Sequence, residues 1–115
     1  MRRIVLTAVL LSGCQSITEP PTLVETYHQP YDRLSECFYS GVRVGLADEA
    51  GIRHEDLKAH GVAIVGQRMR ETPIWEARFI RISANSTRVE VKAMPTIWGH
   101  ALYSEKVYPY LQACA

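Results

Sequence analysis

The strongest constraint on the fold is a run of alternating apolar and polar residues between Gly61 and Met94. The predicted strands are a compact apolar stretch, residues 62–65, and two alternating stretches, 74–82 and 87–94, and turn-forming residues at 71–73 and 83–86 separate them. A period of two places successive side chains on opposite faces of a strand. The apolar set expected on one face is Trp75, Ala77, Phe79, Val89, Val91 and Ala93. The pattern therefore predicts an antiparallel meander with one wet face.

Helical spacing occurs on both sides of this predicted sheet. Pro30 suits a first helical turn, and Leu34, Phe38 and Gly41 follow at intervals of three or four residues. A second apolar face predicts a helix over about 99–113, which Pro109 should kink or split. We therefore expect an α+β fold in two layers, in which a sheet of three to four strands (about 61–94) is flanked by helices at about 30–40 and about 99–113.

The segment between the first helix and the sheet, residues 42–60, is ambiguous. Val42, Val44 and Leu46 alternate, which indicates that the helix gives way to an extended piece at Gly41. Residues 53–58 fit either a turn or two of helix ended by Gly61 or a long surface loop.

The N-terminus has the pattern of a targeting signal. Arg2 and Arg3 precede an apolar run, residues 4–11, that is shorter than the roughly 20 residues of a spanning helix. The run ends in Leu11-Ser12-Gly13-Cys14, which resembles the lipobox of bacterial lipoprotein precursors. The resemblance implies that residues 1–13 are a signal peptide and that Cys14 is acylated on its thiol and new amino group. Ordinary secretory cleavage nearby and a buried N-terminal helix are the alternatives.

Several expectations depend on this lipoprotein assignment. The resemblance extends to the residue after the cysteine, where Gln15, rather than Asp, resembles the sorting signal for the outer membrane. We therefore expect the protein to be anchored in the outer membrane and to face the periplasm. Residues 14–29 contain Pro20-Pro21 and are predicted to be a flexible tether, with residues 30–115 as one globular domain. The alternative is that Leu23, Val24 and Tyr27 pack on the domain as an extra extended segment.

The cysteine count also depends on the lipoprotein assignment. Of the three cysteines, Cys37 and Cys114 remain if Cys14 is acylated. Two cysteines in an exported chain suggest a disulfide bond, and both lie on predicted apolar helix faces. Two buried free thiols are the alternative.

No motif identifies a catalytic or metal site. His54 and His60 are six residues apart, whereas a helical metal pair prefers three or four. The chain contains neither GxSxG nor SxxK, so we expect no catalytic residue, no metal and no cofactor. Aromatic residues with polar tips are enriched at interfaces. In this chain such residues form a possible interaction surface: Trp98, Tyr103, Tyr108 and Tyr110. The alternative is that they pack in the core.

Charge and composition narrow the partner. The formal net charge is +1 and no basic stripe occurs, so nucleic acid is not expected as a partner. We expect a non-enzymatic module, attached to the membrane by its lipid anchor, that binds another envelope protein or has a structural role. The alternatives are a small-ligand binder, an inhibitor of a hydrolase and, least favoured, a cell-wall hydrolase.

Overall fold

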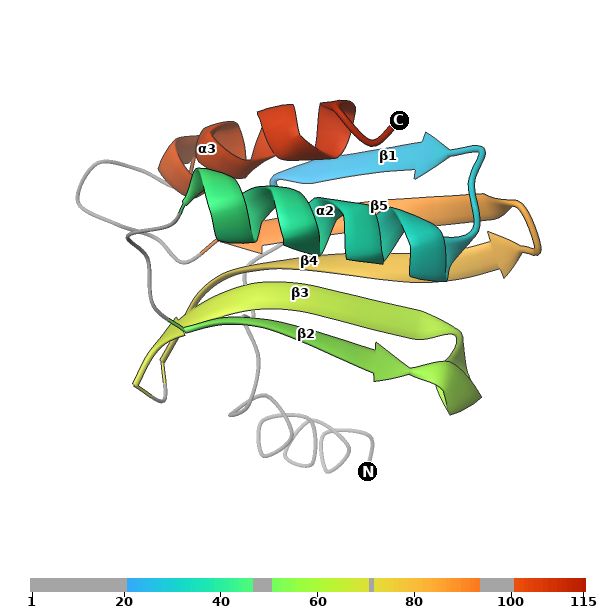
Figure 1. Ribbon diagram of the computed structural model, residues 1–115, viewed down its shortest axis with the longest axis horizontal. Coiled ribbons are helices and arrows are strands. Elements are labelled where there is room, and N and C mark those ends of the chain that lie inside the picture. The colour runs from blue at the N-terminus through green and yellow to red at the C-terminus, as the bar shows by residue number, and fades with distance from the viewer. Residues whose placement is uncertain (1–20, 47–50, 71, 94–100) are drawn as a thin grey trace, which may run out of the picture.

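A computed structural model of the chain describes residues 21–46, 51–70, 72–93 and 101–115 (Figure 1). The elements in chain order are β1 (Leu23–Tyr27), α2 (Tyr31–Gly45), β2 (Ile52–Leu57), the 3-10 turn η2 (Lys58–His60), β3 (Val62–Met69), β4 (Thr72–Ser83), β5 (Ser86–Ala93) and α3 (Ala101–Gln112). The strands form one antiparallel sheet in the order β1-β5-β4-β3-β2. The predicted α+β fold is confirmed, with five strands instead of three to four.

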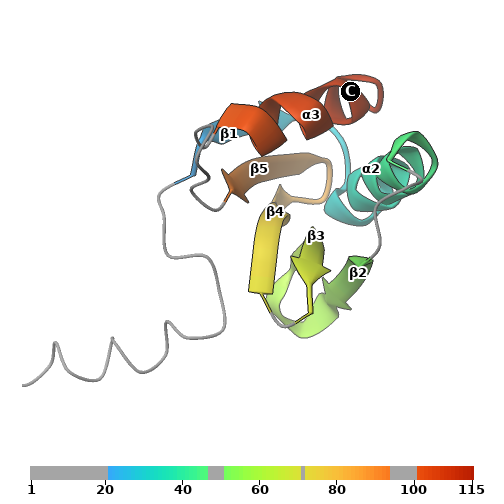
Figure 2. The ribbon, with the colours of Figure 1, turned by 90° about the vertical axis from the view of Figure 1, so that its left-hand side faces the viewer.

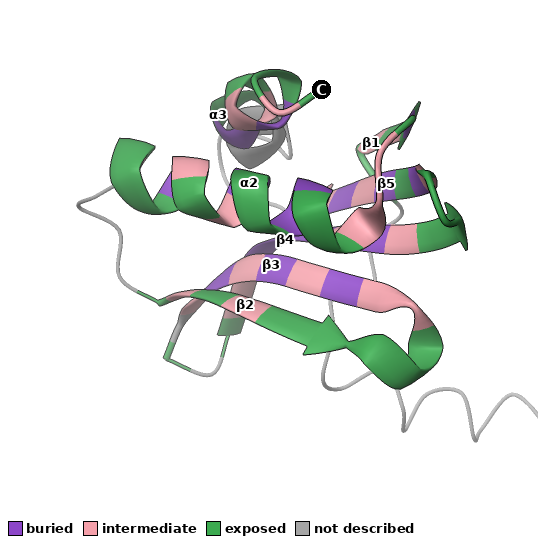
Figure 3. Ribbon diagram, turned by 45° about the vertical axis from the view of Figure 1, so that its right-hand side comes forward, coloured by how far each residue is buried: buried purple, intermediate pink, exposed green. Residues whose placement is uncertain are grey.

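Both helices lie on the same side of the sheet (Figure 2). Helix α2 packs on β2, β3 and β4, and α3 packs on β5 and on α2. The core between the layers contains Phe38 of α2, whose ring lies 6.0 Å from that of Trp75 and 5.6 Å from that of Phe79. Buried and more exposed residues alternate along β3 and β5, as the sequence predicts (Figure 3). The residues predicted to face the core from β4 and β5 are all fully buried.

Strand β1 corrects the prediction of a tether reaching to residue 29. Leu23–Tyr27 pairs with β5 along its whole length, and the Thr22 amide donates to the Val91 carbonyl at 2.8 Å. Leu23 and Tyr27 pack against the core because every second residue of the strand faces the helices. The ordered domain therefore includes residues 23–27, and the remaining tether, residues 14–20, lies outside the described residues.

The region between α2 and β3 differs from the prediction in two ways. Helix α2 continues through Gly41 to Gly45 instead of becoming extended, because Leu34, Phe38 and Val42 form one buried stripe. Residues 52–57 form an edge strand instead of helix or loop, because their backbone pairs with β3. Gly61 does end the short η2 turn, with a left-handed φ of 64°.

Two proline positions also differ from the prediction. The hairpin between β3 and β4 turns at Arg70, so Pro73 lies inside β4, where it pairs with Arg68 beside a bulge. Proline is tolerated there because a bulge already interrupts the hydrogen-bond ladder. Helix α3 is not split, although Pro109 lies inside it and has no N–H to donate to Glu105.

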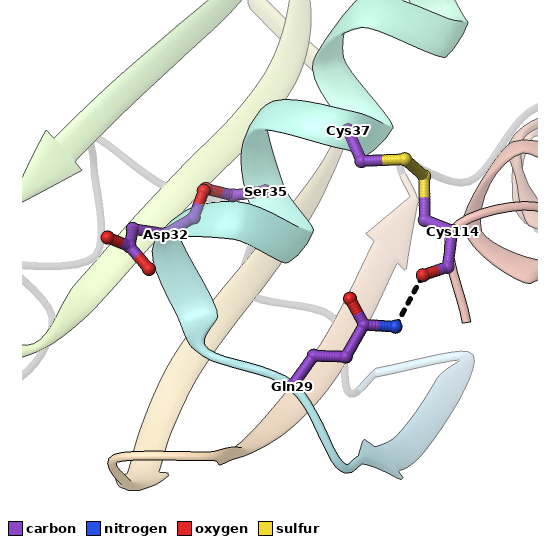
Figure 4. The surroundings of a disulfide bond; sticks show 5 residues. All are labelled: Gln29, Asp32, Ser35, Cys37 and Cys114. Atoms are coloured by element: carbon purple, nitrogen blue, oxygen red, sulfur yellow. Dashed lines mark hydrogen bonds between the residues drawn. A yellow bond between two sulfur atoms is a disulfide. The ribbon is translucent and has the colours of Figure 1, made fainter.

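The predicted disulfide joins Cys37 of α2 to Cys114 beyond the end of α3, with 6.0 Å between the Cα atoms (Figure 4). The Gln29 amide group donates to the Cys114 carbonyl at 2.5 Å, so the segment between β1 and α2 also contacts the C-terminal end. The bridge fixes the two helices to each other on one side of the sheet.

Candidate functional site

The face of the sheet that points away from the helices is not covered by any described element; we call it the open face. The strand register places its side chains in rows that run across the strands. One row contains Leu57, Val62, Ile80, Arg88 and Thr26, and the next contains Glu55, Ile64, Arg78, Glu90 and Val24. Val24 is 53% exposed. The open face therefore presents apolar and charged side chains together.

A hollow of about 400 Å³ lies at Gly66 of β3. Its lining residues are Arg53, His54, Glu55, Ile64, Gly66, Gln67, Arg68, Pro73, Trp75 and Glu76. Most of them belong to the open face, because Arg53 pairs with Gly66, Gly66 pairs with Glu76, and these positions alternate with the buried ones. The hollow therefore lies mainly on the open face, although the core residue Trp75 also lines it.

Gly66 and a bulge shape this hollow. A Cβ at Gly66 would lie 2.9 Å from the Trp75 carbonyl oxygen and 3.2 Å from the Glu76 Cβ, so only glycine fits without displacement. The register shifts after Gln67, which leaves Ile74 as an extra residue in β4. Such bulges bend a strand and redirect its side chains. The missing side chain at Gly66 lets β3 and β4 approach closely, and the bend lies beside the hollow.

Among the described charged side chains around the hollow, some form ion pairs and others do not. Glu76 is buried and accepts a hydrogen bond from the Arg78 Nε at 3.0 Å, so its charge is compensated. Among the residues that the structure describes, neither Arg53 nor Arg68 forms an ion pair. Sequence reasoning missed all of these residues, although a glycine inside a strand pattern is itself a signal of a bulge or a close backbone approach.

A serine beside a histidine would favour a hydrolase, and the structure contains one such pair. Ser35 Oγ lies 3.2 Å from His54 Nε2, but Ser35 is fully buried, so its hydroxyl is closed to a substrate. The same hydroxyl donates to the Asp32 carbonyl at 3.0 Å, so its proton is engaged within α2. A catalytic base, in contrast, must accept the serine proton. Together with the Tyr39 ring 5.1 Å from His54, the pair ties β2 to α2.

Two of the four aromatic residues predicted as an interaction surface, Tyr108 and Tyr110, make contacts within the protein itself. Tyr108 donates to Glu25 of β1 at 2.9 Å, and that hydrogen bond, followed by desolvation, raises the pKa of its phenol. Tyr110 packs against α2, where a Cβ at Gly41 would lie 3.5 Å from its ring and a Cβ at Gly45 would overlap its hydroxyl end. Both are only partly exposed. Trp98 and the Tyr103 side chain lie outside the described residues.

Glu25 is the centre of a polar cluster between β1 and α3. Tyr27 donates to it at 2.6 Å, and Gln112 donates to the Tyr108 hydroxyl at 2.6 Å. Burial, and then the hydrogen bond to Glu25, raise the pKa of the Tyr27 phenol far above its ordinary value. The cluster fixes the edge strand beneath α3, and its donors and acceptors are used within the protein.

Comparisons with known proteins find no matching family model and no matching curated protein. Among the described residues, no group of three or more histidine, cysteine or acidic side chains is placed to hold a metal ion. None of the described helices is long and apolar enough to cross a membrane. Cys14 and the lipobox lie outside the described residues, so the lipid anchor is a prediction from the sequence.

Proposed function

We propose that this protein is a lipid-anchored, non-enzymatic binding module of the bacterial cell envelope. Acylated Cys14 would attach it to the outer membrane, and the domain would face the periplasm. The observation that supports a binding role most directly is the open face, because a sheet whose described helices cover one side only leaves a broad surface for a partner. Exposed apolar side chains there would gain from being covered.

The partner we propose is another envelope protein that docks on the open face. Val24 and Leu57 are exposed apolar residues at its two edges, with ion-paired Arg78 and Arg88 between them. An apolar and charged mixture is typical of protein interfaces, where the apolar part supplies affinity and the charges supply specificity. A small-ligand binder could instead hold an apolar ligand between the sheet and the helices, but this has less support, because large buried side chains fill that space.

A pair of exposed valines provides the test. Val24, 53% exposed, lies on the open face, and Val44, 79% exposed, lies on α2 on the helix side. A photo-crosslinking residue at position 24 should capture one defined protein in living cells, whereas the same residue at 44 should not. Capture should disappear when Arg88 is replaced by Glu. Equal capture from both positions, or capture unaffected by Arg88→Glu, would contradict the assignment.

The anchor has its own test. Cys14→Ser should release the protein from membranes and abolish labelling with radioactive palmitate, because the acylated thiol is lost. A Cys37→Ser variant serves as the control, since it should lose the disulfide and keep the label. Continued labelling of the Cys14→Ser variant would refute the lipoprotein assignment.

A further inference from the structure

We infer that the hollow at Gly66 binds an oxyanion, either a carboxylate or a phosphate, between the guanidinium groups of Arg53 and Arg68. This inference goes beyond the proposed protein partner, because it assigns a small-ligand site whose occupation needs no docked protein.

The size of the hollow fits a small ligand. Its volume of about 400 Å³ falls within the range of small-molecule sites, which begins at about 300 Å³. At Gly66 strand β4 comes close, since a Cβ there would lie 2.9 Å from the Trp75 carbonyl oxygen, so the hollow lies beside this close approach and is bounded by the lining side chains. Ile64, next to Gly66 on the same face, adds an apolar surface. The space exceeds that of a bare phosphate ion, so the anion would be one end of a larger molecule.

The charges determine which kind of ligand the hollow takes. Glu76 is paired with Arg78, and Glu90 with Arg88, so these four charges are compensated on the open face. Arg53 on β2 and Arg68 on β3 both line the hollow, and within the described residues neither forms an ion pair with a carboxylate. Among the described residues that line the hollow, Arg53 and Arg68 are then opposed by a single further acidic side chain, that of Glu55. The local balance is therefore cationic.

Guanidinium groups favour oxyanions in particular. Their planar donor geometry matches the two oxygens of a carboxylate or phosphate, and such charge-assisted hydrogen bonds are stronger than neutral ones. Arg68 sits at the bulge, and its amide donates to the Gly51 carbonyl at 3.2 Å. A fixed backbone at this position holds one wall of the hollow. Glu55 would accept a hydrogen bond from a hydroxyl or ammonium group elsewhere on the ligand.

The experiment uses the protein purified from its cell in a neutral detergent and labelled with nitrogen-15. Inorganic phosphate, glycerol phosphate and N-acetylglycine are titrated separately, and the amide resonance of Gly66 is followed. We expect a saturable shift with at least one of these anions and none with methylammonium. Tighter binding of glycerol phosphate would indicate a lipid headgroup, and tighter binding of N-acetylglycine would indicate a peptide carboxylate. Saturation by methylammonium, or by no anion, would overturn the inference.

Matched variants identify the residues. The double variant Arg53→Gln, Arg68→Gln should weaken binding by about tenfold or more, because two charge-assisted contacts are lost. Arg88→Gln removes a charge from the same face outside the hollow and should leave binding within about twofold. Unchanged melting temperatures show that the variants fold. Equal weakening by Arg88→Gln would overturn the site, whereas crosslinking from position 24 tests the protein partner independently.

Discussion

The face of the sheet beneath the helices is closed by aliphatic and aromatic side chains, whereas the open face carries charged rows and the hollow at Gly66. On the covered face, Phe38, Trp75 and Phe79 are fully buried and in contact. On the open face, Glu76 is a carboxylate that is only 8% exposed and Gly66 occupies a strand interior. Both choices cost stability relative to an apolar or β-branched residue.

The residues on the open face are less favourable for stability than those on the covered face. A buried carboxylate needs an ion pair to compensate its desolvation, and a glycine in a strand contributes no packing. The hairpin beside the hollow adds a third cost, because Arg70 has a left-handed φ of 61°. Unfavourable choices that cluster on one side of a sheet are typical of a binding surface, where they shape a site. This supports a role for the open face beyond folding.

The largest expected effect on stability comes from a substitution on the covered face, compared with one on the open face. Phe38→Ala should lower the free energy of unfolding by about 3–5 kcal/mol, because it leaves a cavity between α2 and the sheet. Val24→Ala on the open face should change it by no more than about 0.5 kcal/mol. Urea denaturation followed by tryptophan fluorescence measures both. Similar losses would mean that the open face is also packed in the native protein.

The sequence predicts elements well where one strong periodicity acts alone. In β4 and β5, Trp75, Phe79 and Val91 alternate with polar residues because one face is buried and the other is wet. The edge strands lack that signal. In β2, Arg53 to Leu57 are mostly exposed and their backbone pairs on one side only, so the stretch reads as a loop. Its strand conformation depends on β3, which periodicity within the segment does not reveal.

Contacts between distant segments also explain the missed parts of α2 and of the site. The part of α2 beyond Gly41 also packs on Tyr110, which is far along the chain and lies in the groove that Gly41 and Gly45 leave. The hollow depends on neighbours from β2 and β4, so Gly66 alone predicts a bulge or a close approach and not a site. The disulfide was predictable because it follows from the cysteine count and an oxidising compartment.

A smaller effect is expected from the carboxylates Glu76 and Glu25, which lie on opposite faces of the sheet. Glu76 depends on an ion pair, whereas Glu25, under α3, accepts hydrogen bonds from Tyr27 and Tyr108. Because the folded state raises the pKa of both phenols, their contribution to stability is complete below about pH 10 and is lost as the pH rises further. The free energy of unfolding should therefore fall above about pH 10.

Tyr27→Phe separates this cluster from general alkaline effects. The variant should lose about 1–2 kcal/mol at neutral pH, because Glu25 loses a hydrogen-bond donor. It should then lose less than the native protein between about pH 9 and pH 12, since one phenol with a raised pKa is gone. Denaturation curves at matched ionic strength measure both quantities. An equal alkaline loss in the two proteins would exclude Tyr27 as a source of the pH dependence.

The smallest effect lies at the hairpin beside the hollow. Arg70→Gly should raise the free energy of unfolding by about 0.5–1 kcal/mol, because relief of the left-handed strain exceeds the added entropy of the unfolded chain. Arg68→Gly is the matched control, because Arg68 lies within β3 and has no positive φ, so glycine there should destabilise. A gain at both positions would assign the effect to the removal of positive charge. Opposite signs would place the strain in the backbone at residue 70.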